Sequence, residues 1–190
     1  MTARFALAAA AFVALGGCAG VPRAPESAAA DAAAVAVPFE AEGRLSARRG
    51  SDGVAGQFAW THDGANDRIV LSTPLGQTIA RLSGDAAGVR VEASDGRVET
   101  APAWDALSTN ALGFTLPVGG LAAWIRGLPR PGVPATVERD ALGRPALLRQ
   151  EGWEIVYAYA DDAAPRAARM TLRYAGADAI EVRLVVDRWQ

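Results

Sequence analysis

The chain has 190 residues, of which 51% are hydrophobic and 21% are charged, and its net charge is −2. This composition is that of an ordinary globular protein, and it excludes a disordered chain, a collagen-like chain and a membrane protein with several spanning helices. All 19 basic residues are arginine, acidic residues outnumber them, and the longest basic run is Arg48-Arg49. Nucleic acid is therefore not an expected partner.

The residues at the start of the chain have the order of a secretory signal, which we place at 1–17. Arg4 is followed by an uncharged apolar run from Phe5 to Leu15, too short to cross a bilayer. The run ends in Leu15-Gly16-Gly17-Cys18, the pattern of a bacterial lipobox, in which Gly16 replaces the more usual Ala or Ser. We therefore expect cleavage before Cys18 and lipid on its thiol and amine, a two-signal anchor that holds a protein stably on a membrane.

Residues 18–38 form the lipidated Cys and an Ala- and Pro-rich tether that cannot bury enough apolar area to fold by itself. Its stretch from Ser27 to Val37 has an N-cap residue and high helix propensity, so a short helix can form there. Ala19 follows the Cys, where an Asp would retain a lipoprotein of enteric-type bacteria at the inner membrane. This favours an outer-membrane location, with the folded part facing the periplasm.

From Phe39 onward the dominant period is two, which predicts an antiparallel sheet with one buried face and about ten or eleven strands. The runs Phe39–Leu45, Trp153–Tyr159 and Ile180–Val186 alternate most clearly. Turns are predicted between the runs at Asp52-Gly53, Asp63-Gly64, Asp95-Gly96, Leu142-Gly143 and Ala175-Gly176.

One segment interrupts the β pattern. Pro102–Leu107 predicts a turn or two of helix with Pro at its first position, and Pro117–Arg126 predicts a better helix, followed by Gly127 at its C-terminal end. Gly119-Gly120 lowers the helix propensity, so the apolar stripe must be held by packing, and the apolar concave face of the sheet is the surface for it. The period does not decide whether the space between helix and sheet is filled or is a cavity.

Several motifs, in order and spacing, resemble the LolB family, the outer-membrane lipoprotein receptors of the lipoprotein localisation pathway. The resemblance covers about residues 39–189. It rests on the segments Gly43–Ser46, Gly56–Trp60, Leu71–Leu82, Leu116–Val118, Trp124–Pro129 and Gln150–Tyr157, with Leu121, Tyr159 and Trp189.

This resemblance implies that residues 39–190 form a mainly β domain, an incomplete antiparallel barrel of about eleven strands with a short helical lid over an apolar cavity. It implies a monomeric receptor that takes acylated lipoproteins from a LolA-type periplasmic carrier and inserts them into the inner leaflet of the outer membrane. No cofactor beyond the lipid on Cys18 is expected. The residues expected at the cavity and lid are Phe58, Trp60, Leu71, Leu82, Leu121, Trp124, Ile125, Trp153, Ile155 and Tyr157.

Pro74-Leu75-Gly76 is turn chemistry between two strands, and a Leu in a tight turn projects outward. Taken alone, Leu75 is an incidental exposed residue. The resemblance implies a different role, because this position matches the protruding-loop Leu with which the family delivers cargo to the bilayer.

Two other classes of function stay open. A structural or assembly lipoprotein with a filled core would share the anchor and the sheet. A lipid hydrolase would need a nucleophile and a base, but no Gly-x-Ser-x-Gly is present. The single His62 is interpreted as a solvated residue of a turn, and Asp161-Asp162 as a solvated loop, so we expect that the protein is not an enzyme and binds no metal.

Overall fold

The computed structural model describes residues 33–112, 118–174, 176 and 179–190. The signal segment and Cys18 lie outside these residues. In the described part, no helix is both long and apolar enough to cross a membrane.

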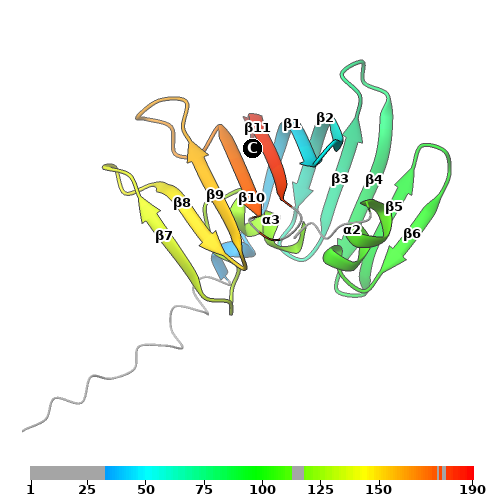
Figure 1. Cartoon of the computed structure of the whole chain (residues 1–190), viewed down its shortest axis with the longest axis horizontal. Helices are drawn as coiled ribbons and strands as arrows, with labels where there is room; N and C mark the ends of the chain where they lie inside the picture. Colours follow the sequence, from blue (N-terminus) through cyan, green and yellow to red (C-terminus); the bar gives the residue numbers. More distant parts are fainter. Residues whose placement is uncertain (1–32, 113–117, 175, 177–178) are drawn as a thin grey trace, which may run out of the picture.

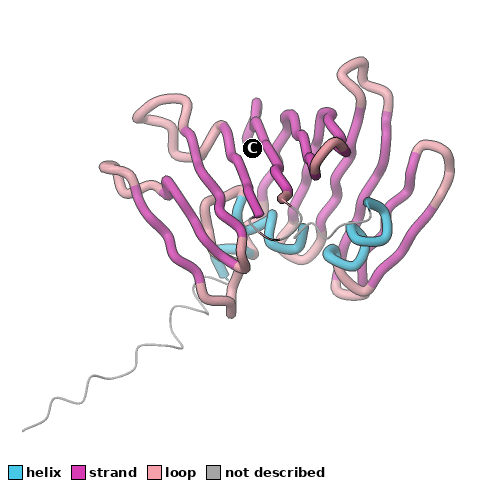
Figure 2. The backbone as a smooth tube through the Cα atoms, viewed as in Figure 1, coloured by secondary structure: helices cyan, strands magenta, loops and turns pink. Residues whose placement is uncertain are grey.

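Eleven antiparallel strands form one strongly curved sheet, and two short helices lie on its concave side (Figure 1, Figure 2). The sheet is open, since β6 and β7 are its two edges and the strand order is β6-β5-β4-β3-β2-β1-β11-β10-β9-β8-β7. The predicted fold class, a mainly β, incomplete antiparallel barrel of about eleven strands with a short helical lid, is confirmed by this open sheet and its short helices. The elements are β1 Phe39–Arg49, β2 Asp52–His62, β3 Asp67–Ser72, β4 Thr78–Asp85, β5 Gly88–Ala93, β6 Val98–Ala101, α2 Trp104–Leu112, α3 Val118–Trp124, β7 Ala135–Arg139, β8 Pro145–Gln150, β9 Trp153–Ala158, β10 Arg169–Tyr174 and β11 Ile180–Trp189.

The register places the apolar positions of neighbouring strands side by side on the concave face. Gly43 pairs with Phe58, and Phe58 pairs with Leu71. On the other half of the sheet, Tyr157 pairs with Met170, which pairs with Leu184. Period-two patterning on every strand thus builds one continuous apolar surface, because alternate side chains point to the same face.

Ionic pairs occupy the opposite, convex face. Arg44 binds Asp187 at 2.8 Å, and Arg173 binds Glu181 at 3.0 Å across neighbouring strands. These residues are the polar partners in the alternation, and exposed pairs of this kind contribute little stability individually.

The predicted position of the first turn is wrong. The first hairpin turns at Gly50-Ser51, while Asp52 and Gly53 already pair with β1. Gly50 has a φ of 57°, and a glycine at the first position of a two-residue loop matches the twist of the strands. The predicted turns at Gly64, Gly96 and Gly143 are present, each with a positive φ, whereas Ala175 lies outside the described residues.

The helices are also displaced from their predicted bounds. α2 runs from Trp104 to Leu112, later than predicted, because its first backbone bond joins Leu107 to the carbonyl of Ala103. Pro102 therefore precedes the helix. α3 ends at Trp124, two residues before its predicted end, and Pro117 lies outside the described residues. Gly127 caps the helix as predicted: it has a φ of 74°, its N–H bonds the carbonyl of Trp124, and the N–H of Leu128 bonds that of Ala123, the paired bonds of a Schellman motif.

Candidate functional site

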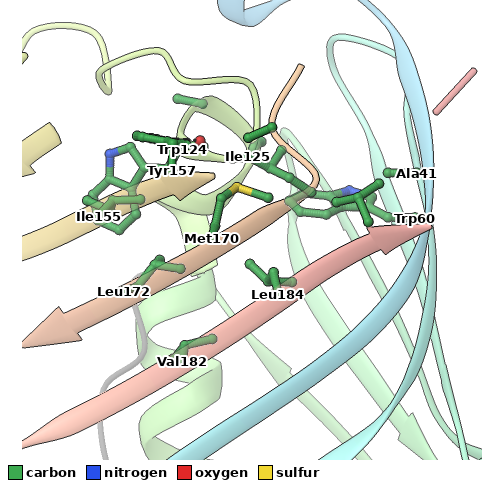
Figure 3. Packing of buried hydrophobic residues seen from close by; sticks show 14 of the residues in the cluster. Ala41, Trp60, Trp124, Ile125, Ile155, Tyr157, Met170, Leu172, Val182 and Leu184 are labelled. Atoms are coloured by element: carbon green, nitrogen blue, oxygen red, sulfur yellow. Dashed lines mark hydrogen bonds between the residues drawn. The ribbon is translucent and has the colours of Figure 1, made fainter. Parts of the chain in front are cut away.

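The concave face, together with the helices on it, is the candidate site. Its buried side chains form a single hydrophobic cluster that runs from Phe39 and Trp60 on one half of the sheet to Trp153 on the other. In Figure 3, Trp124 lies close to Ile155 and Tyr157, while Met170 and Leu184 lie between this group and Trp60.

The structure brings all ten residues predicted for the cavity and lid to this cluster or against it, but in two states of exposure. Seven are buried, with exposed fractions between 0% for Trp124 and 6% for Tyr157. The other three, Leu71, Leu82 and Leu121, are partly exposed. The buried seven are Phe58, Trp60, Trp124, Ile125, Trp153, Ile155 and Tyr157.

The partly exposed leucines mark where the apolar face is least filled. Leu71 and Leu82 lie on β3 and β4, next to the buried Ile69. Leu45 on β1 is also partly exposed, and its neighbour on β2 is Gly56, which adds no side chain to the face. Sequence reasoning placed Leu45 on the apolar face but did not include it in the site. An apolar chain entering the face would gain most at these positions, since they still have surface to bury.

Trp124 is held by polar contacts as well as by packing. Its indole Nε1 donates to Oε1 of Gln150 at 2.8 Å, and its carbonyl accepts from the hydroxyl of Tyr157 at 2.9 Å. Burial of this hydroxyl raises the pKa of Tyr157 above its ordinary value, because the charged phenolate would lose its hydration. Trp124 thereby joins α3 to both β8 and β9.

Gln150, which sequence reasoning missed, is the polar centre of this region. The side chain is buried, with 3% exposed. Its Oε1 accepts from Trp124 and from the backbone N–H of Arg130, while its Nε2 donates to the carbonyls of Arg130 and Val133. The amide thus satisfies the backbone that leads from α3 to β7. Its polar type at an inward position of a strand was the available signal.

The prediction that His62 is a solvated turn residue is wrong. The last residue of β2, it is 6% exposed, and its Nδ1 lies 2.9 Å from Oδ1 of Asp67. Its Nε2 lies 3.1 Å from the carbonyl of Val35, and the ring stacks on Phe39 at 5.1 Å. The segment preceding β1 covers the ring, and only tertiary structure brings that segment there.

Arg126, which follows the last residue of α3, contacts the same segment that covers His62. Its Nε donates to the carbonyl of Ala122, and its Nη1 donates to those of Ala34 and Val37. Burial lowers the pKa of this guanidinium, and nearby Arg166 lowers it further. Residues 33–35 are helical, so part of the predicted tether helix is present at this contact.

At the other end of the lid, α2 packs on β5 and β6 and contacts α3. Gly84 on β4 admits the Trp104 ring, because a Cβ there would lie 2.5 Å from Cζ2 of Trp104. Leu107 is 2% exposed. Among the described side chains of the helix, Trp104 and Leu107 thus both contribute apolar packing.

The loop between β3 and β4 carries the most exposed large apolar side chain of the described part. Leu75 is 91% exposed, as expected for a Leu in this turn. The N–H of Gly76 donates to the carbonyl of Thr73 at 2.9 Å, and the N–H of Thr73 donates to the carbonyl of Gln77 at 2.8 Å. With a φ of 83° at Gly76, this is a three-residue hairpin loop ending in a bulge. The loop projects beyond the neighbouring strands (Figure 1).

Comparison with known proteins agrees with this architecture. A family model described as "Outer membrane lipoprotein LolB" matches residues 37–189. The outer-membrane lipoprotein LolB of Thiobacillus denitrificans is 41% identical over 182 residues, 93% of this chain and 92% of the relative. That of Azoarcus sp. is 36% identical over 82% of this chain and 80% of its own.

A LolA superfamily protein from Nitrosomonas europaea has the same fold, with a TM-score of 0.54 at 10% identity over 87% of this chain and 92% of its own. The open sheet, the helices on its concave face and the match along nearly all of the folded part agree, and the chain belongs to the LolB family of outer-membrane lipoproteins.

Proposed function

We propose that this protein is the outer-membrane receptor that accepts acylated lipoproteins from a LolA-type carrier and inserts them into the inner leaflet of the outer membrane. The observation that carries the proposal is the continuous apolar concave face of an open sheet, on which two short helices lie. Lipid on Cys18 would anchor the protein with this face in the periplasm. Family membership supports the outer-membrane location and the prediction that the chain is not an enzyme.

Transfer without a fuel requires that each acceptor binds the acyl chains more tightly than the donor. Each buried CH₂ contributes about 0.8 kcal/mol, so one long acyl chain contributes on the order of 10 kcal/mol. The receptor must replace most of this burial while the cargo is out of the bilayer. We infer that the chains displace the lid from the concave face and pack first against Leu71 and Leu82 on the sheet and against Leu121 on the lid helix, which already expose apolar surface.

Pro74-Leu75-Gly76 is proposed to contact the bilayer during delivery. One Leu entering lipid gains about 1.5–3 kcal/mol, too little to anchor the protein but enough to bias where the concave face opens. We expect Leu75→Glu to leave folding and uptake from the carrier unchanged and to block transfer to liposomes. The assay separates the two steps, carrier to receptor and receptor to liposome.

Leu142 provides a matched control. Leu142 is the central residue of another three-residue loop and is 56% exposed. In this loop the N–H of Gly143 donates to the carbonyl of Asp140, and the N–H of Asp140 donates to the carbonyl of Arg144. Leu142→Glu removes an exposed Leu from the same loop geometry and should insert cargo at the wild-type rate. Equal loss of insertion in both variants, or loss of uptake in Leu75→Glu, would contradict the role of Leu75.

The alternative, a structural lipoprotein with a permanently filled core, makes a different prediction for the wild-type protein. A receptor binds a fluorescent long-chain fatty acid stoichiometrically, and an acylated peptide displaces the fatty acid from it. A filled core does neither, so this titration decides between the two functions.

A further inference from the structure

The guanidinium of Arg126 joins two segments that are far apart in the sequence. Nε bonds the carbonyl of Ala122 in α3 at 2.9 Å. Nη1 bonds the carbonyls of Ala34 at 3.0 Å and Val37 at 2.7 Å, and Nη2 bonds that of Val35. One side chain therefore holds the C-terminal end of the lid helix and the last residues before β1.

Aromatic side chains complete this contact. Arg126 lies over the ring of Phe39, 5.1 Å from its centroid, an arrangement that adds cation–π attraction. Phe39 in turn stacks on His62, whose Nε2 faces the carbonyl of Val35. Arg126 and His62 thus bind the segment 34–37 through backbone carbonyls. These contacts do not depend on which side chains the segment carries.

Apart from these bonds, the segment is held mainly by Val35, which packs against the core cluster. Ala36 and Val37 are exposed, and Val35 is only partly buried. A segment with few buried apolar contacts opens at a low free-energy cost, so the hydrogen bonds from Arg126 largely set how often it is released.

We propose that Arg126 is a positioning residue that latches the base of the membrane tether, residues 34–37, onto α3 and so stabilises the closed lid. The inference rests on the proposed function, since α3 must leave the concave face to admit acyl chains. Release of the latch and displacement of the lid are then coupled. Thermodynamic linkage makes this coupling reciprocal: if release of residues 34–37 raises the affinity for acyl chains by some factor, acyl binding raises the equilibrium constant for their release by the same factor.

A double-mutant cycle tests the latch in the soluble full-length Cys18→Ser protein. The two changes are Arg126→Gln and deletion of residues 33–37, which ends before β1. The readouts are the rate of uptake of a fluorescent long-chain fatty acid and amide hydrogen exchange in α3. Each single change should speed both about tenfold, and the two together should do no more than either alone.

Arg130→Gln is the matched control, because Arg130 lies on the same connection but its guanidinium binds Glu151 and not the tether. It should leave uptake and exchange at wild-type values. Arg126→Lys, which keeps the charge but not the forked donors, should fall between wild type and Arg126→Gln.

Three results would overturn the latch: no change in α3 exchange on deletion of residues 33–37, additive effects of the two changes, or an equal effect of Arg130→Gln. Failure of the wild-type protein to bind the fatty acid would instead contradict the proposed function. The exchange measurement still decides the latch in that case, since it needs no ligand.

Discussion

The indole of Trp124 and the side-chain amide of Gln150 form a buried hydrogen bond of 2.8 Å between the lid helix and β8. The indole is fully buried. The side-chain amide of Gln150 accepts two hydrogen bonds at Oε1 and donates two from Nε2. The lid is therefore not held by apolar packing alone. A polar bond whose partners are both buried defines one closed position, because moving either partner leaves the other without a bond.

Gln150→Leu should destabilise the protein by about 2–4 kcal/mol, since it leaves the Trp124 N–H and the backbone groups of Arg130 and Val133 unpaired in the core. Urea unfolding measures the loss. Trp124→Phe removes one donor and keeps the other bonds of Gln150, so its cost should be lower, about 1–2 kcal/mol. If Gln150→Leu is neutral, the amide does not organise this region.

Leu82→Gln and Ile155→Gln form a pair that separates ligand surface from core. Leu82 is partly exposed and Ile155 is 0% exposed, although both lie on the concave face. We expect Leu82→Gln to weaken fatty-acid binding about tenfold while costing about 1 kcal/mol of stability. Ile155→Gln should cost about 3 kcal/mol or more, because the amide would be buried without partners. Fluorescence titration and urea unfolding of both variants give the comparison, and equal stability losses would mean that the two positions do not differ.

Period-two alternation could predict the strands and the apolar face because each strand carries that signal locally. It could not distinguish Ile155 from Leu82, since both satisfy the pattern of the face and only the packed structure separates their exposure. The difference depends on which residues the lid reaches.

The prediction for His62 was wrong for a related reason. Its neighbours Asp63 and Gly64 do form a turn, so the local prediction for them was correct. What buries the ring is Val35, from the segment before β1, and Phe39, its cross-strand partner at the start of β1. No spacing in the sequence encodes a contact between a turn and a tether. The role of Arg126 was hidden in the same way.

Adjacent glycines in α3 should respond oppositely to alanine. A Cβ on Gly119 would have no neighbour closer than 3.8 Å, so Gly119→Ala should stabilise the protein by about 0.5–1 kcal/mol through helix propensity. A Cβ on Gly120 would lie 3.0 Å from Cζ2 of Trp124, which cannot shift without losing its bond to Gln150. Gly120→Ala should therefore cost about 1 kcal/mol or more despite its better propensity. Thermal unfolding of the two variants checks the sign of each change, and two stabilised proteins would show that Trp124 is free to move.

The length of the tether should limit delivery, because the latch and the delivery loop lie at opposite ends of the same strands. Val35 contacts His62, next to the start of β3, whereas Leu75 follows the end of β3. Strand and loop together separate the two by roughly 25 Å. The stretch of about 15 residues between Cys18 and residue 33 can span at most about 50 Å, so both the anchor and Leu75 can reach one bilayer.

Deleting residues 20–33 leaves about six residues between Cys18 and Pro38 even when residues 34–37 are released from Arg126, and these span no more than about 20 Å. We expect this variant to fold and to accept cargo from the carrier, but to insert cargo into liposomes at least tenfold more slowly, because an anchored protein cannot bring Leu75 to the membrane. Replacing the same fourteen residues by a Gly/Ser sequence of equal length should restore insertion, because the length of the tether and not its sequence is required. Insertion at the wild-type rate by the shortened protein would mean that Leu75 does not need to contact the bilayer that holds the anchor.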